Sequence, residues 1–478
     1  MVFPIVGGDG KPTGYEISNS LRFNDGDSPA LTRTMGAPTS TRKFTYVGWL
    51  KRSNLGIQSS FLSWGGSTYA TDFRYESSSN SLYFYFDDNT GWYAKTKSVY
   101  RDVSAWYQVV LAVDTTQATE SNRVKLYVNG TQYGSALDGT DWTQHEIFGQ
   151  NYDFPELANG QTMAIGKRNS SGSHFFDGYM SEVYFIDGQA LDSSYFGETD
   201  DNGVWIPKEY DGTYGNNGFL LQFKQTGTSQ NSSGIGADTS GNDNHFAVPN
   251  LGANSPTLDT PTNNYCVLNQ LYKATTGSTA RPTISSGNIA VARVADASTQ
   301  STFGMASGKW YFEVRYNSGQ VDGYPQIGYS KSGGINAGEM VGFHTPSGSN
   351  YRGKIASTVV ANAFDGTISS NDILGFYMNI DDGTLIVHKN GSDFMGSGAS
   401  SGLDFSSTSF SPDTGFFHIH VNDNTDSTTI SEFNFGNPAF SVSSGNTDAN
   451  GYGNFEHSPT LSGTAYYAIN SKNIAEFG

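Results

Sequence analysis

Short segments of alternating apolar and polar residues recur along the chain, and several end in residue pairs that favour tight hairpin turns. In residues 123–130, three apolar side chains share one strand face, and the closing Asn-Gly pair is the preferred pair for a type I′ turn. Residues 372–391 form a second hairpin around Asp382 and Gly383. The pattern predicts half-buried antiparallel strands and an all-β fold.

The length and composition of the chain fit such a fold. At roughly 100 to 200 residues per domain, 478 residues suggest two to four domains. The 57 glycines suit many tight turns, and an aromatic content of 14% supplies enough apolar surface for a folded core. The one cysteine, Cys266, excludes an intrachain disulfide, so packing must stabilise each domain without a covalent cross-link.

Charge and hydropathy argue against two classes of partner. Acidic residues (45) outnumber basic residues (27), and the resulting net charge of -18 repels phosphate backbones, so we expect no nucleic acid partner. No apolar run approaches the roughly 18 residues that span a bilayer, so we expect no membrane insertion. The first ten residues lack the basic and apolar regions of a secretion signal, which predicts synthesis in a reducing cytoplasm.

The strand pattern divides the chain into five segments. Residues 1–14 form an N-terminal arm, and residues 15–225 form a first strand-rich domain. Residues 226–285 are rich in Gly, Ser and Asn, which is typical of a linker. A second strand-rich domain covers residues 286–440. The remaining residues 441–478 are too short to fold alone, and we expect them to pad the second domain or to contact a partner.

Both strand-rich domains resemble known families of β-sandwich. In the first, the ordered motifs YVGWLKRS, FLSW, WYQVVLAVD, VKLYVNG and FFDGYMSEVYFIDGQAL resemble the laminin-G-like branch of the concanavalin A-like jelly rolls. In the second, GKWYFEVRY, PQIGYS, DILGFYMNIDDGTLIVHKNG and EFNFGNPAF resemble SPRY domains. These resemblances imply two tandem antiparallel β-sandwiches, a concanavalin A-like jelly roll followed by a SPRY-like sandwich.

The tandem as a whole resembles structural proteins of tailed bacteriophages, particularly of marine phages. The joining motifs DTSGNDNHF and DTPTNNYCVLN and the closing motif NGYGNFEHSP contribute to this resemblance. It implies a place in the virion after synthesis in the host cytoplasm, contact with other virion proteins, and a homo-oligomer.

Three functions are compatible with that resemblance. The first is a tail- or fibre-associated adhesin whose sandwich loops bind a host surface polysaccharide. The alternative is a capsid-decoration or fibre protein with a purely structural role. The third is a polysaccharide depolymerase, which the search for catalytic motifs disfavours.

The chain lacks the carboxylate signature of retaining glucanases, which places carboxylates at alternating strand positions about 5 Å apart. The nearest pair, Glu182 and Asp187, has a spacing that puts the two side chains on opposite strand faces. Residues 398–402 match the Gly-x-Ser-x-Gly nucleophile pattern but lack its strand-turn-helix context. Cys266 has no evident histidine partner. We therefore expect no catalytic residues and no enzymatic activity.

A group of aromatic and oxygen-bearing residues in the first domain meets the requirements of a glycan site. Sugars stack on aromatic rings through their C–H surfaces, and amides and carboxylates pair with their hydroxyls. The candidate ligand-binding residues, all expected in loops, are Trp64, Tyr69, Asp87, Asp88, Asn89, Trp92 and Tyr93.

Two strand ends carry oxygen clusters that could bind a cation. Laminin-G-like domains often bind calcium at a sandwich edge, so the resemblance implies Ca²⁺ as the candidate cofactor, although no ligand position can be carried over from the family. The oxygen clusters themselves make Asp87, Asp88, Asp423 and Asp426 the candidate ligands. Residues 238–244 have the spacing of the first half of a calcium loop but lack its turn glycine and later glutamate. That loop is better interpreted as an Asx turn.

His418 and His420 share one face of a strand. Around a three-fold axis, such a pair from each chain could supply six nitrogen ligands to a transition metal. The simpler interpretation is a pair of exposed histidines on a sandwich strand.

Overall fold

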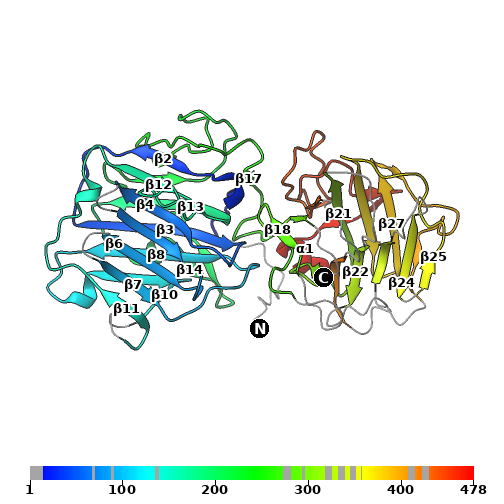
Figure 1. Ribbon diagram of the computed structural model, residues 1–478, viewed down its shortest axis with the longest axis horizontal. Coiled ribbons are helices and arrows are strands. Elements are labelled where there is room, and N and C mark those ends of the chain that lie inside the picture. Colours follow the sequence, from blue (N-terminus) through cyan, green and yellow to red (C-terminus); the bar gives the residue numbers. More distant parts are fainter. Residues whose placement is uncertain are drawn as a thin grey trace. The chain divides into compact units, whose positions relative to one another are not determined.

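A computed structural model describes twelve stretches of the chain: residues 14–66, 70–87, 91–134, 139–272, 281–292, 297–317, 326–331, 340–344, 351–356, 358–406, 415–422 and 430–478. The chain divides into two compact units, an N-terminal unit (Gly10–Thr262) and a C-terminal unit (Asn263–Gly478). Both consist mainly of antiparallel sheets, with a parallel pair, β21 (Lys309–Tyr316) with β34 (Tyr467–Ala468), in the C-terminal unit (Figure 1).

The N-terminal unit is a sandwich of two antiparallel sheets. The first has the order β10 (Thr131–Gln132), β9 (Val124–Val128), β8 (Tyr107–Asp114), β3 (Lys43–Arg52), β13 (Gly178–Asp187), β1 (Ser20–Phe23) and β17 (Pro256–Thr257), with β16 (Phe219–Leu221) also paired to β13. The second has the order β11 (Trp142–Glu146), β7 (Trp92–Thr96), β6 (Leu82–Asp87), β5 (Ala70–Tyr75), β4 (Ser59–Gly65), β12 (Thr162–Ile165) and β2 (Leu31–Thr34).

Short elements complete this unit. They are a hairpin of β14 (Gly197–Thr199) and β15 (Trp205–Pro207), and the 3₁₀ turns η1 (Asp25–Asp27), η2 (Glu120–Asn122), η3 (Pro155–Leu157) and η4 (Ser193–Tyr195).

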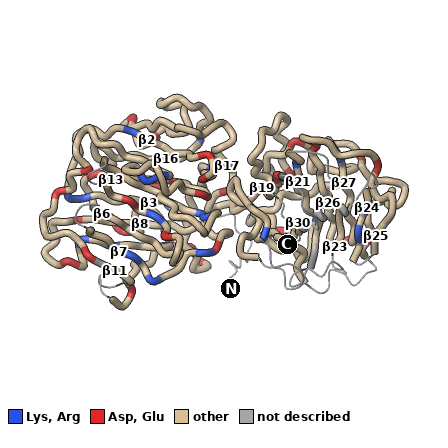
Figure 2. The backbone as a smooth tube through the Cα atoms, in the orientation of Figure 1, with Lys and Arg blue, Asp and Glu red and all other residues tan. Residues whose placement is uncertain are grey.

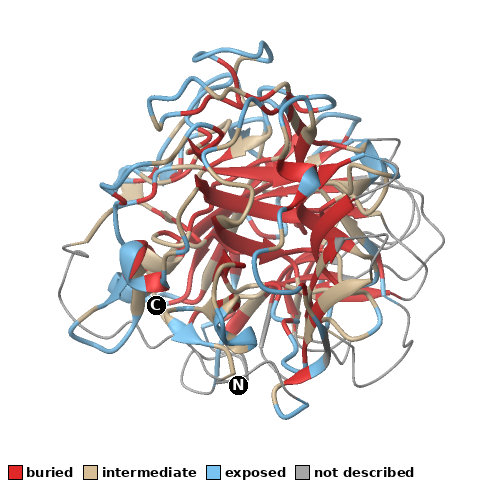
Figure 3. Ribbon diagram, turned by 90° about the vertical axis from the view of Figure 1, so that its left-hand side faces the viewer, coloured by how far each residue is buried: buried red, intermediate tan, exposed pale blue. Residues whose placement is uncertain are grey.

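The core of the N-terminal unit lies between its two sheets and is rich in aromatic rings. Phe44 of the first sheet stacks on Phe185 at a centroid distance of 5.6 Å and meets Trp64 of the second sheet edge-on at 5.3 Å. The alternation of β8 explains this packing, because Leu111 faces this core while Val110 faces a second apolar cluster on the other side of the same sheet. Buried residues are concentrated on the strands and exposed residues on the connecting loops (Figure 3).

The segment 226–285, expected from its composition to be a linker, is divided between the two units. Its first part, up to Thr262, belongs to the N-terminal unit, and the remainder belongs to the C-terminal unit. The first part supplies four apolar residues to the core of the N-terminal unit: Ile235, Phe246, Val248 and Leu251. A Gly- and Ser-rich segment can be buried with few apolar residues when its polar groups form hydrogen bonds. Asp238, for example, accepts hydrogen bonds from Leu220 N and Ser240 N.

The C-terminal unit is a second sandwich. Its larger sheet has the order β18 (Thr283–Ser285), β19 (Ala290–Ala292), β31 (Ile430–Asn434), β21 (Lys309–Tyr316), β26 (Ile373–Asn379), β27 (Thr384–Lys389) and β28 (Ser392–Asp393), with β29 (Leu403–Asp404) paired to β27 and β34 (Tyr467–Ala468) to β21. Its smaller sheet has the order β20 (Ser298–Gln300), β30 (Phe417–Asn422), β22 (Gln326–Lys331), β23 (Met340–His344), β24 (Arg352–Ala356) and β25 (Thr358–Val360).

The C-terminal residues fold onto the larger sheet of this unit. They form the hairpin of β32 (Thr460–Leu461) and β33 (Thr464–Ala465), then β34, and then helix α1 (Ser471–Phe477). Ile469 lies in the core of the unit, and the Asn470 side chain caps α1 by accepting a hydrogen bond from Asn473 N at 2.9 Å. No helix in the described part of the chain is long and apolar enough to cross a membrane.

The prediction of an all-β chain with two antiparallel sandwiches is confirmed. The hairpin around Gly383 joins β26 and β27 in the expected register, with Asn379 opposite Thr384.

Candidate functional site

Trp64, predicted as a loop residue that contacts a ligand, is instead part of the core. It lies on β4 with no solvent exposure, and its indole packs edge-on against Phe44 and Phe73 at centroid distances of 5.3 and 5.2 Å. The prediction was wrong because β4 extends through this position and turns the side chain inward. Trp64 therefore cannot contact a ligand from solution.

The structure places two other predicted residues at the start of β7, on different sides of the sheet. Trp92 is half-buried and packs edge-on against Tyr152 at a centroid distance of 4.5 Å, so it closes the end of the core. Tyr93 lies opposite Tyr85 on the outer face. Tyr69, Asp88 and Asn89 lie outside the described residues, as does the side chain of Asp87 at the end of β6.

Tyr93 belongs to a group of three tyrosines on the outer face of the seven-stranded sheet. We call Tyr83, Tyr85 and Tyr93 the tyrosine platform. Their ring centroids are 5.9 to 6.5 Å apart, and each ring is half-exposed. Phe84 and Ala94, which alternate with them along β6 and β7, face the core. The period of two along a strand therefore puts the three rings together on the outside.

Charged residues on β5 continue the platform across the sheet. Arg74 lies opposite Tyr83, with its guanidinium carbon 4.5 Å from the centre of the Tyr83 ring. Arg74 donates to Asp72 Oδ2 at 2.7 Å and to Glu76 Oε2 at 3.4 Å. Because the three residues Asp72, Arg74 and Glu76 alternate with buried Phe73 and Tyr75, all three share the outer face.

Both carboxylates in this row are ionised at neutral pH. Burial would raise the pKa of Asp72, but hydrogen bonds from His174 and Ser60 and the charge of Arg74 outweigh it and hold that pKa below its ordinary value. Burial would also raise the pKa of Glu76. Hydrogen bonds from Gln58 and Arg74 outweigh this effect and lower that pKa. Asp72 is 0% exposed, so only Glu76 is open to a hydrogen bond from a ligand, and neither carboxylate can act as a proton donor near pH 7.

The platform thus combines apolar ring surface with fixed donors and acceptors. The sequence analysis identified only Tyr93 of this group. The signal for the other two was present in SLYFYF, where tyrosine and phenylalanine alternate. It was missed because tyrosines on strands are common, and only the register of β5, β6 and β7 brings these three side by side.

The remaining candidates for catalysis have structural roles. Glu182 is 3% exposed and accepts a hydrogen bond from Tyr184 Oη at 2.6 Å, while burial raises its pKa. Asp187 accepts hydrogen bonds from the backbone amides of Thr39 and Asn217 at 2.7 and 3.0 Å. Cys266 is buried. Each group is committed to holding a loop or a core in place.

The two histidines of β30 are not an exposed pair. His418 Nδ1 lies 3.2 Å from Ser301 O, and His420 is fully buried. Burial lowers the pKa of His420 to about 3. The interpretation as exposed histidines is therefore wrong for His420, because the face of the sheet on which it lies is covered. A buried imidazole is also not available to a metal shared between copies of the chain.

Asp423 and Asp426, the other candidate metal ligands, lie outside the described residues. Among the residues that are described, no three His, Cys, Asp or Glu side chains come together as a metal site.

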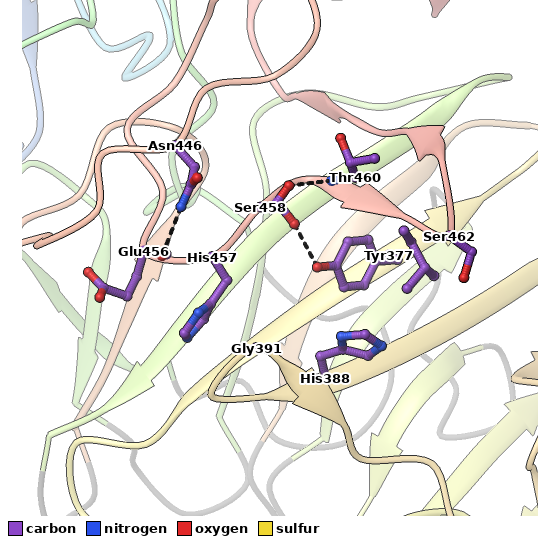
Figure 4. Close-up of a pocket in the computed structure, with 10 residues that line it drawn as sticks. Tyr377, His388, Gly391, Asn446, Glu456, His457, Ser458, Thr460 and Ser462 are labelled. Atoms are coloured by element: carbon purple, nitrogen blue, oxygen red, sulfur yellow. Dashed lines mark hydrogen bonds between the residues drawn. The ribbon is translucent and has the colours of Figure 1, made fainter.

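The C-terminal unit contains a pocket of about 460 Å³ that the sequence analysis did not predict (Figure 4). It lies between β26, β27 and the segment 446–462, and the described residues that line it are Tyr377, His388, Gly391, Asn446, Glu456, His457, Ser458, Thr460, Leu461 and Ser462. No local pattern signals it, since its two walls are more than 50 residues apart in the sequence.

One comparison with protein families matches part of the N-terminal unit. Residues 24–194 match a laminin G model described as the concanavalin A-like lectin/glucanases superfamily. No curated protein matches the chain.

Solved structures with similar folds include three that each cover part of this chain. A putative carbohydrate-binding protein from Bacteroides ovatus is 16% identical, with a TM-score of 0.32 and coverage of 49% of this chain and 58% of the other. The CBM40 module of the Ruminococcus gnavus IT-sialidase, bound to α2,3-sialyllactose, is 16% identical, with a TM-score of 0.25 and coverage of 38% and 92%.

The SPRY domain of human HERC1 is 11% identical, with a TM-score of 0.21 and coverage of 30% of this chain and 87% of the other. Of the two resemblances read from the sequence motifs, the concanavalin A-like one is supported by the family match over residues 24–194.

Proposed function

We propose that this protein binds carbohydrate on the outer face of the seven-stranded sheet of its N-terminal unit, through the tyrosine platform. The observation that carries the proposal is the meeting of Tyr83, Tyr85 and Tyr93 beside the charged row of β5. The match of residues 24–194 to a lectin-containing superfamily supports it independently.

The chemistry of the platform suits a sugar chain. Half-exposed aromatic rings offer apolar surface to the C–H groups of a pyranose, and their hydroxyls and the neighbouring Lys95 can pair with sugar hydroxyls. Arg74 with Asp72 and Glu76 sums to one negative charge, and Lys95 beside the Tyr83 ring offsets it, which favours a neutral or weakly charged polysaccharide.

Binding without hydrolysis is the better interpretation of the same residues. A retaining or inverting glycosidase needs one carboxyl group with a raised pKa that protonates the leaving oxygen. The pKa values of Asp72 and Glu76 are both lowered. A depolymerase that uses this face is therefore disfavoured.

We further propose that the protein is a structural component of a bacteriophage virion, a tail- or fibre-associated adhesin that binds host surface polysaccharide. The resemblance of the tandem motifs to tailed-phage structural proteins supports this place, and with it contacts to other virion proteins and a homo-oligomer. A capsid-decoration or fibre protein with a purely structural role is the competing proposal. A binding test separates the two, since decoration requires no glycan ligand.

The test is binding of the purified protein to a polysaccharide array and to host cells, with wild type compared with Tyr85→Ala and Tyr93→Ala. Each variant removes one ring of the platform, and we expect about a tenfold loss of affinity from each. Tyr195→Ala is the matched control, because Tyr195 is 47% exposed and its neighbour Phe196 packs on the opposite side of the sandwich.

Each outcome of the test bears on one part of the proposal. Saturable binding that both platform variants weaken and the control retains supports the platform as the site. Equal binding by all four proteins rejects the platform, and no binding by a folded wild type favours decoration. Repeating the assay with a chelator tests whether calcium takes part.

A further inference from the structure

The pocket of the C-terminal unit is open to solvent and is lined by parts of the chain that are distant in sequence. Tyr377 of β26 and His388 of β27 form one wall, and the segment 456–462 forms the other (Figure 4). The Tyr377 hydroxyl donates to Ser458 O at 2.7 Å, which ties the two walls together. At about 460 Å³ the pocket falls within the range of small-molecule sites, roughly 300 to 1,000 Å³.

Among the described residues that line the pocket, the one charged side chain is a carboxylate that is already hydrogen-bonded. Of the ten described residues that line the pocket, none is lysine or arginine. The carboxylate among them, Glu456, accepts hydrogen bonds from Ser443 N at 2.7 Å and from Ser443 Oγ at 2.5 Å. An anion would meet no cation here, and a cation would meet a carboxylate that is already engaged.

Two imidazoles supply the main polar groups. Burial lowers the pKa of His388 and of His457, so both rings are neutral near pH 7, and a neutral imidazole offers one donor and one acceptor. His457 Nε2 is buried and has no hydrogen-bond partner among the described residues. A buried nitrogen without a partner costs stability, and a rotation of the imidazole toward the pocket would let a ligand hydroxyl satisfy it.

Hydroxyl side chains and an aromatic ring complete the lining. Thr460 and Ser462 lie on or beside β32, near the edge of the pocket, and Tyr377 packs edge-on against His388 at a centroid distance of 5.0 Å. Tyr377 is 3% exposed and shapes the wall without offering ring surface, so the accessible lining is made of neutral donors and acceptors, which match an uncharged molecule that carries hydroxyls.

We propose that this pocket binds an uncharged sugar residue, with His388 and His457 facing its hydroxyls. The site lies in the C-terminal unit and shares no residue with the tyrosine platform, so it would be a second carbohydrate site. Its existence does not depend on whether the platform binds glycan.

The experiment follows the histidine ring C–H resonances of the full chain by NMR, with ¹³C-labelled histidine. The chain contains 8 histidines, and single variants assign those of His388 and His457. The probes are the methyl glycosides of glucose, galactose and mannose, each added to about 50 mM, a concentration that exceeds even a Kd of about 10 mM. We expect concentration-dependent shifts confined to these two histidines.

Two pocket variants and one control give the result its specificity. His457→Phe keeps a planar ring but removes both nitrogens, and we expect about a tenfold loss of affinity. Thr460 is exposed, so Thr460→Val should not disturb folding. We expect this variant to lower the affinity for the glycosides by about threefold. Tyr93→Ala should leave the shifts unchanged, which separates this site from the platform.

The proposal is overturned if none of the three glycosides shifts either histidine in the folded wild type. It is also overturned if Thr460→Val and a folded His457→Phe both bind with wild-type affinity. A result in which Tyr93→Ala abolishes the shifts would assign the binding to the platform instead.

Discussion

His420 is buried, although the alternation of residues along its strand predicted an exposed side chain. It alternates with the apolar residues of β30, yet both faces of this strand are covered, and the imidazole is fully buried. Across the smaller sheet, His420, Gly328, Gly342 and Lys354 lie in one row on four neighbouring strands. The two glycines carry no side chain between His420 and Lys354. Burial is the main cause of the low pKa of His420, and the charge of Lys354 lowers that pKa further.

This burial predicts a specific dependence of stability on pH. The pKa of His420 is about 3 in the folded state and 6.5 in the unfolded state, so its contribution to stability is present above pH 6.5 and is lost as the pH falls toward 3. Between pH 6 and 4.5, His420→Gln and His420→Leu should reduce the slope of unfolding free energy against pH by up to about 1.4 kcal/mol per unit.

Chemical denaturation at several pH values measures this slope. The slope, and not the absolute stability, is the readout, because either substitution also changes packing. Slopes equal to wild type in both variants would contradict the assignment of a low pKa to His420.

At the scale of elements, a buried ion pair fastens the segment after β17 onto the first sheet of the N-terminal unit. Lys51 of β3 donates to Asp259 Oδ2 at 2.7 Å, and the two side chains are 1% and 0% exposed. Trp106 Nε1 donates to the other carboxylate oxygen at 3.1 Å, and Ser20 Oγ donates to Asp259 O at 2.6 Å. One acidic residue thereby connects three separate parts of the sandwich.

Removing one member of this pair should destabilise the protein strongly. Asp259→Ala leaves the Lys51 ammonium buried without its counter-charge, and we expect a loss of about 3 to 5 kcal/mol in unfolding free energy. Asp153→Ala is the matched control, because Asp153 pairs with Arg42 at 2.7 Å but is 54% exposed, and its loss should cost about 1 kcal/mol or less. Denaturant melts of the two variants compare these losses directly, and equal losses would refute the argument.

At the scale of the whole molecule, the two units have separate hydrophobic cores. One core contains residues from Leu21 to Leu251, and the other contains residues from Cys266 to Ile469. Acidic and basic residues are scattered over the backbone of both units (Figure 2). Each unit is large enough to bury a core of its own.

This division predicts where the chain can be cut. A fragment of residues 10–262 should fold cooperatively, while a fragment of residues 10–225 should be unfolded or unstable. The shorter fragment lacks four core residues and Asp259. Circular dichroism and thermal melting of both fragments provide the measurement. A stable 10–225 fragment would support a domain boundary near residue 225, as expected from composition, and would contradict the boundary at residue 262.

The amino-acid sequence determined the local structure of this protein. Alternation along segments such as 123–130 and the turn pair at Gly383 depend on neighbouring residues alone, so the strands and the hairpins could be predicted. The two-sandwich organisation was implied by the resemblance of the motifs to two β-sandwich families. Tyr93 could be identified as a candidate because the linear sequence alone shows an aromatic residue near the end of a predicted strand.

The tertiary structure decided which faces are covered and which residues meet. Trp64 and His420 are buried, and Tyr83 and Tyr85 join Tyr93, because of strand register and of segments that arrive from elsewhere in the chain. The pocket at His457 exists because residues beyond 440 return to the sheet. Burial and side-chain encounters depend on long-range packing, and a pattern of period two along one strand shows which residues share a face but not what covers that face.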